Sequence, residues 1–112
     1  MRKLFVSAVV LGSLVSQAAL ADVRSCNRKL DIFEDASSSL GDSLWDCGRW
    51  TSQGRIVNNE YRSAVSELWR LSNSTADTAI NECRGLLDSE QVVNNLRTTV
   101  NETYDVLPEC HN

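Results

Sequence analysis

Four cysteines are the feature that most constrains the fold of this chain. They stand far apart, at Cys26, Cys47, Cys83 and Cys110, and no two of them form a C-x-x-C pair. Redox-active and zinc-binding cysteines usually occur in such close pairs, so we expect neither chemistry here and no cofactor. An even number of widely spaced cysteines is typical of disulfides in exported proteins. The sequence therefore predicts two structural bridges, each stabilising the fold by about 2–4 kcal/mol.

The first 21 residues have the layout of a secretory signal peptide. A cationic start, Met1-Arg2-Lys3, precedes an apolar run of about twelve residues, and Ala19-Leu20-Ala21 is a small-x-small cleavage pattern. The run is shorter than the roughly twenty residues of a membrane-spanning helix, although an uncleaved anchor is the alternative. The residue after the cut is Asp22, not a cysteine that could carry a lipid. We predict cleavage after Ala21 and a periplasmic or secreted product without membrane association.

Size and charge narrow the range of partners. Removing residues 1–21 from the 112 of the chain leaves 91, residues 22–112, which suffice for a single helical domain with a modest core. The leader takes two of the eleven basic residues, so nine remain against all fifteen acidic ones, a formal charge of −6. Nucleic acids and anionic membranes require clustered Lys and Arg, so the sequence argues against both as partners.

Apolar residues recur every three or four positions, which predicts an all-α fold. The first series predicts one long helix that ends near Gly48, despite the poor helix propensity of residues 37–39 and Gly41. Later series predict three more helices, with breaks at Ser72-Asn73-Ser74 and within 86–91, and Pro108 ends the last one. The predicted fold is a small, disulfide-linked, up-down four-helix bundle. The alternative has three helices, the last of them continuous over 75–107. The apolar stripe of the first helix consists of Cys26, Leu30, Phe33, Ala36, Leu40, Leu44 and Cys47.

The number of helices decides how the cysteines pair. Cys26 and Cys47 lie 21 residues apart on one helix, which separates them by about 31 Å, whereas a disulfide needs Cα atoms within about 7 Å. A Cys26–Cys47 bridge is therefore excluded, and Cys83–Cys110 with it. Four alternating helices predict Cys26–Cys110 and Cys47–Cys83, which is the pairing we favour. Three helices would give Cys26–Cys83 and Cys47–Cys110.

The predicted loop over residues 48–55 is the first candidate for a binding site. It places Trp50 between two glycines, with Arg49 and Arg55 on either side. Loops frequently carry function, and Trp and Arg are the residues most enriched at binding hot spots. These three residues are therefore predicted to contact a partner. The alternative is that Trp50 folds down and covers the end of the bundle.

The second candidate is an acidic ridge on the polar side of the first helix. It consists of Asp31, Asp35, Asp42 and Asp46, in which like charges stand one turn apart and mildly destabilise an isolated helix. Binding of a basic partner or a cation would explain why that cost is retained, whereas a solvated face that maintains solubility is the alternative. An open helix face lacks the cleft that paired carboxylates need for acid–base catalysis.

The remaining motifs do not indicate an enzyme. The only histidine, His111, lies at an end expected to be flexible, so no base stands beside a serine or cysteine nucleophile, and a metal site is not expected. No glycine-rich phosphate loop follows a strand. Two glycosylation patterns begin at Asn73 and Asn101 and would matter in a eukaryotic host.

These features favour an exported, non-enzymatic protein that binds another protein through a helical surface and the 48–55 loop. An inhibitor, an immunity protein or an accessory subunit would fit this description. Trp45 and Trp69 stand beside core positions and are expected to widen the buried face. The alternative function is a carrier that holds a small apolar ligand inside the bundle. Its cavity would be lined by Phe33, Leu40, Tyr61, Leu68 and Trp69.

Overall fold

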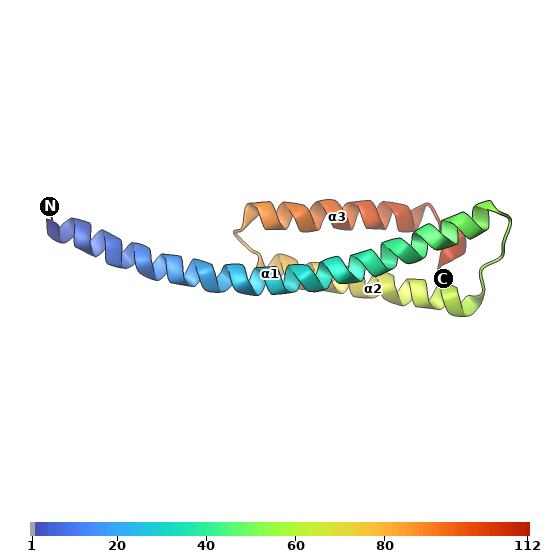
Figure 1. Cartoon of the computed structure of the whole chain (residues 1–112), viewed down its shortest axis with the longest axis horizontal. Helices are drawn as coiled ribbons and strands as arrows, with labels where there is room; N and C mark the ends of the chain where they lie inside the picture. The colour runs from blue at the N-terminus through green and yellow to red at the C-terminus, as the bar shows by residue number, and fades with distance from the viewer. Residues whose placement is uncertain (1) are drawn as a thin grey trace.

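A computed structural model describes the backbone of residues 2–112 and the side chains of residues 23–112, and the predicted signal peptide over 1–21 lies outside those side chains. Three helices pack against one another and alternate in direction (Figure 1). No strand occurs in the described backbone, so the all-α prediction is confirmed. The elements are α1 (Arg2–Ser52), α2 (Asn59–Glu82), α3 (Leu87–Asp105) and a short 3₁₀ helix, η1 (Pro108–Cys110).

The prediction of four helices is wrong because the chain does not break at residues 72–74. These residues lie inside α2, where their polar side chains find partners without leaving the helix. The hydroxyl groups of Ser72 and Ser37 are hydrogen-bonded at 3.0 Å, and both side chains are buried. The hydroxyls of Thr75 and Thr78 donate to carbonyl oxygens one turn earlier. The chain thus has three helices, the number in the alternative.

The turn between α2 and α3 covers residues 83–86, whereas a break was expected within 86–91. The two segments overlap only at Leu86. Gly85 has a φ of +88°, a left-handed conformation that glycine adopts at little steric cost. The amide of Leu86 donates to the carbonyl oxygen of Cys83 at 2.8 Å and closes the turn. The helix considered over 75–107 is therefore divided here, and α3 begins only at Leu87.

Three helical passes determine how the cysteines pair. The end of α2 returns to the level of Cys26, while the C-terminus lies at the other end of the bundle, where α1 leads into α2 (Figure 1). Cys26 is accordingly bonded to Cys83 and Cys47 to Cys110, with Cα–Cα distances of 4.7 and 5.9 Å. The pairing favoured from the sequence is wrong because it assumed a fourth pass. The alternative pairing for three helices is the one found.

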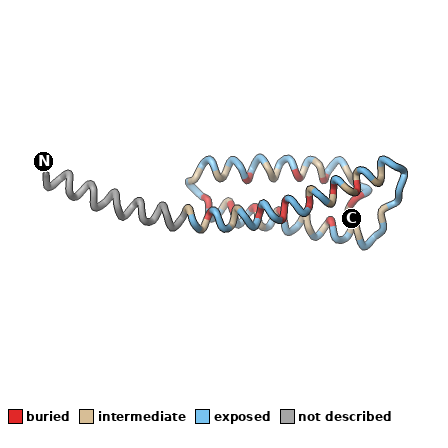
Figure 2. The backbone as a smooth tube through the Cα atoms, in the orientation of Figure 1, coloured by how far each residue is buried: buried red, intermediate tan, exposed pale blue. Residues whose placement is uncertain are grey.

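Buried residues recur along all three helices, as the red segments of the backbone in Figure 2 show. Toward Cys26 the core contains one large α1 side chain, Phe33, and several small residues of α1 and α2, since Ser37, Ser72, Ala76 and Ala79 are all buried. Small side chains let two helices approach closely, which explains why a serine is tolerated in the middle of α1. Larger buried side chains fill the core toward Cys47, and they include Leu40, Leu44, Val65, Val100 and Tyr104.

The two bridges are typical of proteins that fold in an oxidising compartment of the extracellular type. Where side chains are described, none of the helices offers an apolar stretch of the length needed to cross a membrane. A bundle of this size has a small core, so the covalent links contribute a substantial part of its stability.

Candidate protein-binding surface

Most of the predicted 48–55 loop is helical. α1 continues to Ser52, and the hydroxyl of Thr51 donates to the carbonyl oxygen of Gly48 at 3.2 Å. The turn comes at Gly54, which has a φ of +78°. The prediction that Gly48 ends the helix is wrong, because a glycine inside a helix costs only about 1 kcal/mol and half-buried Trp50 and Thr51 still pack beyond it. Trp50 consequently lies on the last turn of α1.

Trp50 packs against α2 and does not extend into solvent. Its ring meets the ring of Tyr61 edge-on, with centroids 5.1 Å apart, and the side chain is half-buried. The Tyr61 hydroxyl in turn donates to the backbone carbonyl oxygen of Ser43 at 2.7 Å. Burial raises the pKa of Tyr61 above 10.0, the side chain of Ser43 opposes this shift, and the charge of Asp46 adds to it. Trp50 thus covers this end of the bundle, as the alternative interpretation has it.

The short connection after α1 exposes other side chains. Arg55 is exposed, and Ile56 is 97% exposed. Together with Trp50 they line a shallow surface hollow of about 420 Å³. The connection therefore presents an exposed apolar side chain next to a cation.

The acidic ridge faces solvent as expected from its position opposite the apolar stripe. Asp31, Asp35 and Asp42 are exposed, and Asp46 is half-buried. Arg49 lies 3.6 Å from Asp46 and joins the ridge. An ion pair this exposed contributes little to stability, so the ridge keeps most of its negative potential.

Trp45 is the functional candidate that the sequence interpretation missed. It was expected to widen the buried face, but its side chain is 75% exposed, so that expectation is wrong. Its neighbours on the same helix face are Asp42, three residues before it, and Arg49, four residues after it. Asp42 and Arg49 both lie on the polar side of α1, so their spacing from Trp45 already indicated that Trp45 is exposed.

Trp45 borders a groove between the last turns of α1 and the end of α3, which we call the α1–α3 groove. Its volume is about 350 Å³. Val106, on the turn that ends α3, directly precedes the lining residue Leu107 and is 72% exposed. The groove is lined by Leu44, Trp45, Gly48, Arg49, Thr103 and Leu107.

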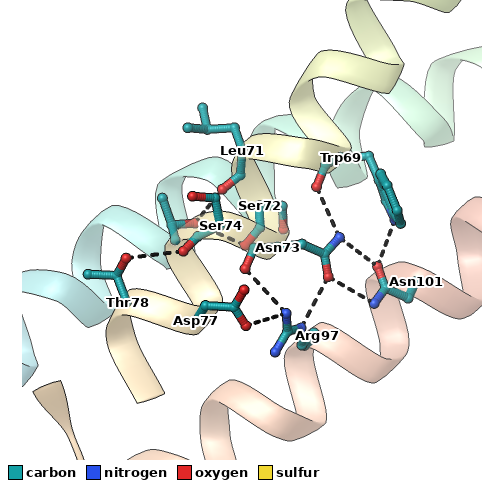
Figure 3. Close-up of polar contacts among 10 residues, drawn as sticks. Trp69, Leu71, Ser72, Asn73, Ser74, Asp77, Thr78, Arg97 and Asn101 are labelled. Carbon is teal, nitrogen blue, oxygen red and sulfur yellow. Dashed lines mark hydrogen bonds and ion pairs between the residues drawn. The ribbon is translucent and has the colours of Figure 1, made fainter. Parts of the chain in front are cut away.

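A polar network joins the middle of α2 to α3 (Figure 3). The side-chain amides of Asn73 and Asn101 bond to each other in both directions at 3.2 Å. The indole N–H of Trp69 donates to Asn101 at 2.9 Å, and Arg97 donates to both Asn73 and Asp77, at 3.1 and 2.7 Å. Trp69 also packs against the core, as expected. Both asparagines of the glycosylation patterns are therefore used to hold the bundle together.

The C-terminal residues are fixed to the bundle, contrary to the expectation of a flexible end around His111. The imidazole stacks on the ring of Tyr104 with centroids 3.5 Å apart, and its Nε2 lies 2.9 Å from the Tyr104 carbonyl oxygen. The guanidinium of Arg62 donates twice to the backbone carbonyl oxygen of His111, at 2.9 and 3.1 Å. His111 thus serves in packing.

Neither a metal centre nor the predicted ligand cavity is supported by the positions of the residues concerned. Among the side chains of 23–112, no three His, Cys, Asp or Glu residues gather in a way that would hold a metal ion. Phe33 and Leu40 are completely buried in the core. Tyr61, Leu68 and Trp69 pack against the Leu40 cluster. The five residues expected to line a cavity are therefore used for packing the core.

Comparison with protein families, with curated proteins and with solved structures finds no match to this chain.

Proposed function

We propose that this chain is an exported, non-enzymatic protein that binds another protein, as an inhibitor, immunity protein or accessory subunit does. It acts after loss of residues 1–21, in the periplasm or outside the cell. The contact surface has two parts. The first is the end of the bundle where α1 leads into α2, here called the α1–α2 end, which comprises residues 45–56 and 103–107. The second is the acidic ridge along α1.

The observation that carries this proposal is the exposure of large apolar side chains at the α1–α2 end. Trp45, Ile56 and Val106 are 75, 97 and 72% exposed. Among residues 23–112 only Leu87, at the opposite end, is comparably exposed for a large apolar side chain, and exposed apolar surface is a common feature of interaction sites. Arg49 and Arg55 lie beside them, and Trp with Arg is the combination most common at binding hot spots.

The rigidity of this end supports the proposal further. The Cys47–Cys110 bridge ties α1 to the C-terminus, and Trp50 packs on Tyr61. A surface that is already ordered loses little conformational entropy when a partner binds. The α1–α2 end is therefore well suited to specific recognition.

Site-specific photo-crosslinking in the source organism tests this function. A photoreactive phenylalanine analogue is placed at Ile56 in one variant and, as the matched control, at Leu87, which is 75% exposed at the opposite end of the bundle. We expect a single defined protein adduct from position 56 and none from position 87. Absence of an adduct at 56, or the same adduct from both positions, would contradict the proposed function.

A further inference from the structure

A polar hollow lies between α2 and α3, next to the point where Asn112 is hydrogen-bonded to α2. α2 contributes most of its lining residues, α3 contributes Tyr104, and Asn112 completes the lining. We call it the α2–α3 hollow. Its volume is about 260 Å³. Small-molecule sites begin at about 300 Å³, so the hollow has room for a group of the size of one small ring.

The hydroxyl group of Tyr104 has no hydrogen-bond partner among residues 23–112, since the bonds to this residue end at its backbone carbonyl oxygen. Tyr104 is only 8% exposed, because the rings of Trp69 and His111 stack on it with centroids 4.9 and 3.5 Å away. Every fully buried side-chain oxygen in the described part of the chain has a partner, so this hydroxyl reaches the surface. A phenol held by two stacked rings thus offers its hydroxyl at the hollow that Tyr104 lines.

Trp69 gives the hollow an apolar wall. Its only polar side-chain atom, the indole nitrogen, donates to Asn101 at 2.9 Å, so the carbon surface of the ring is what remains for a ligand. The stack on Tyr104 holds the indole in place. An apolar ring beside a free hydroxyl group fits a ligand that has both kinds of surface.

The side chains that line the hollow carry no net charge. Glu67 and Arg70 are paired at 2.9 Å, so the two charges in the lining offset each other. Ser63 accepts a hydrogen bond from the side-chain amide of Asn112 at 2.9 Å, and its own hydroxyl proton has no acceptor within residues 23–112. Ser63 and Tyr104 therefore offer two hydroxyl groups that can donate to a ligand.

We propose that the α2–α3 hollow binds one neutral sugar ring. Such a ring has an apolar C–H face, which packs on Trp69, and hydroxyl groups, which exchange hydrogen bonds with Tyr104 and Ser63. A charged ligand would lose hydration without gaining an unpaired counter-charge, and a purely apolar ligand would leave the Tyr104 hydroxyl without a partner. The inference adds a second binding site to the proposed function, and neither depends on the other.

The test uses the exported protein with both bridges intact and a panel of methyl glycosides of neutral hexoses and N-acetylhexosamines. Two further probes serve for comparison. Glucuronate carries a carboxylate on the sugar ring, and N-methylacetamide presents a peptide group without a sugar. Amide chemical shifts locate the contact, the resonance of the Trp69 indole N–H reports on the apolar wall, and titration of these shifts gives Kd.

We expect at least one neutral glycoside to bind with a Kd of about 1 mM, as suits a ligand of so few atoms, and to shift the resonances of Ser66, Arg70 and the Trp69 indole. Tyr104→Phe keeps the stacked ring and removes only the hydroxyl, so it should weaken binding about threefold to tenfold. Ser63→Ala, at an exposed position that the fold tolerates, should also weaken binding. The matched control is Tyr61→Phe, whose hydroxyl bonds to Ser43 of α1, and it should leave Kd unchanged.

The inference is overturned if no neutral glycoside binds, if the shifts lie elsewhere, or if both Tyr104→Phe and Ser63→Ala bind as tightly as the unmodified protein. It is also overturned if glucuronate or N-methylacetamide binds as tightly as the best neutral glycoside, because the hollow would then select an anion or a peptide group. None of these outcomes changes the adduct expected at Ile56, so the proposed function is tested separately.

Discussion

Two glycines of the chain, Gly41 and Gly85, have different backbone conformations. Gly41 lies within α1, and a Cβ added there would meet nothing within 4 Å. Gly85 has a φ of +88° in the turn before α3, a conformation in which a Cβ is crowded by its own backbone. The sequence shows only that both residues are glycine, and the backbone conformation shows which of the two is required.

Alanine substitution at these two positions should therefore change stability in opposite directions. We expect Gly41→Ala to raise the free energy of unfolding by about 0.5–1 kcal/mol, because alanine is the better helix former. Gly85→Ala should lower it by about 1–2 kcal/mol. Urea denaturation followed by circular dichroism measures both values. A change of the same sign in the two variants would contradict the assigned backbone conformations.

Tyr61 should make the fold sensitive to alkaline pH. Its pKa in the folded protein is raised above the ordinary 10.0, so the folded state holds the phenolic proton more tightly than the unfolded state. The resulting stability is complete below pH 10.0 and is lost as the pH rises through the raised value. Phenolate formation also removes the hydrogen bond that Tyr61 donates to Ser43.

We expect the free energy of unfolding to fall as the pH rises from 10.0 through the raised pKa of Tyr61, and to fall less in Tyr61→Phe than in the unmodified protein. Urea denaturation across this range provides the measurement. Tyr104→Phe is the control, since it changes the other tyrosine of the chain. Equal pH dependence in Tyr61→Phe and the unmodified protein would show that Tyr61 does not cause it.

At the scale of the elements, the continuity of α2 depends on partners that the sequence does not reveal. The run Ser72-Asn73-Ser74 has the composition of a helix end, which is why a break was predicted there. In the bundle, Ser72 meets Ser37 of α1 and Asn73 meets Asn101 of α3, so each competing polar group is satisfied across a helix interface. Tertiary contact thus overrides local propensity at these residues.

Removal of the Asn73 side chain should therefore cost stability. Asn73→Ala leaves the Arg97 Nε and the Asn101 amide without their acceptor, and half-buried groups that lose such partners cost about 1–3 kcal/mol. Asn81→Ala, at an exposed position of the same helix, should change the free energy of unfolding by less than about 0.5 kcal/mol. Thermal or urea unfolding compares the two variants. Equal losses would contradict a stabilising role for the network.

The helical periodicity predicted the element type and the core more reliably than the surface. Six of the seven residues of the apolar stripe on α1 are buried, and the seventh, Leu30, is half-buried. The stripe also leaves Trp45 outside it, but hydrophobicity alone suggested that a tryptophan beside Leu44 would be buried. The exposed position of Trp45 therefore follows from helix geometry and not from residue type.

At the scale of the whole molecule, the number of helices determines which helix ends, and therefore which cysteines, lie next to each other. Three passes put the ends of α1 and α3 side by side, which creates the α1–α3 groove and places Cys47 against Cys110. Four passes would have placed Cys47 beside Cys83 instead. The disulfide pairing and the existence of the groove are thus consequences of one topological fact.

Mass spectrometry of tryptic peptides under non-reducing conditions tests this topology most directly, because the cleavage sites separate all four cysteines. The three-helix bundle predicts that peptide 25–28, with Cys26, is bonded to peptide 71–84, with Cys83. Peptide 30–49, with Cys47, should be bonded to peptide 98–112, with Cys110. Recovery of 25–28 bonded to 98–112, together with 30–49 bonded to 71–84, would contradict the bundle and the groove built on it.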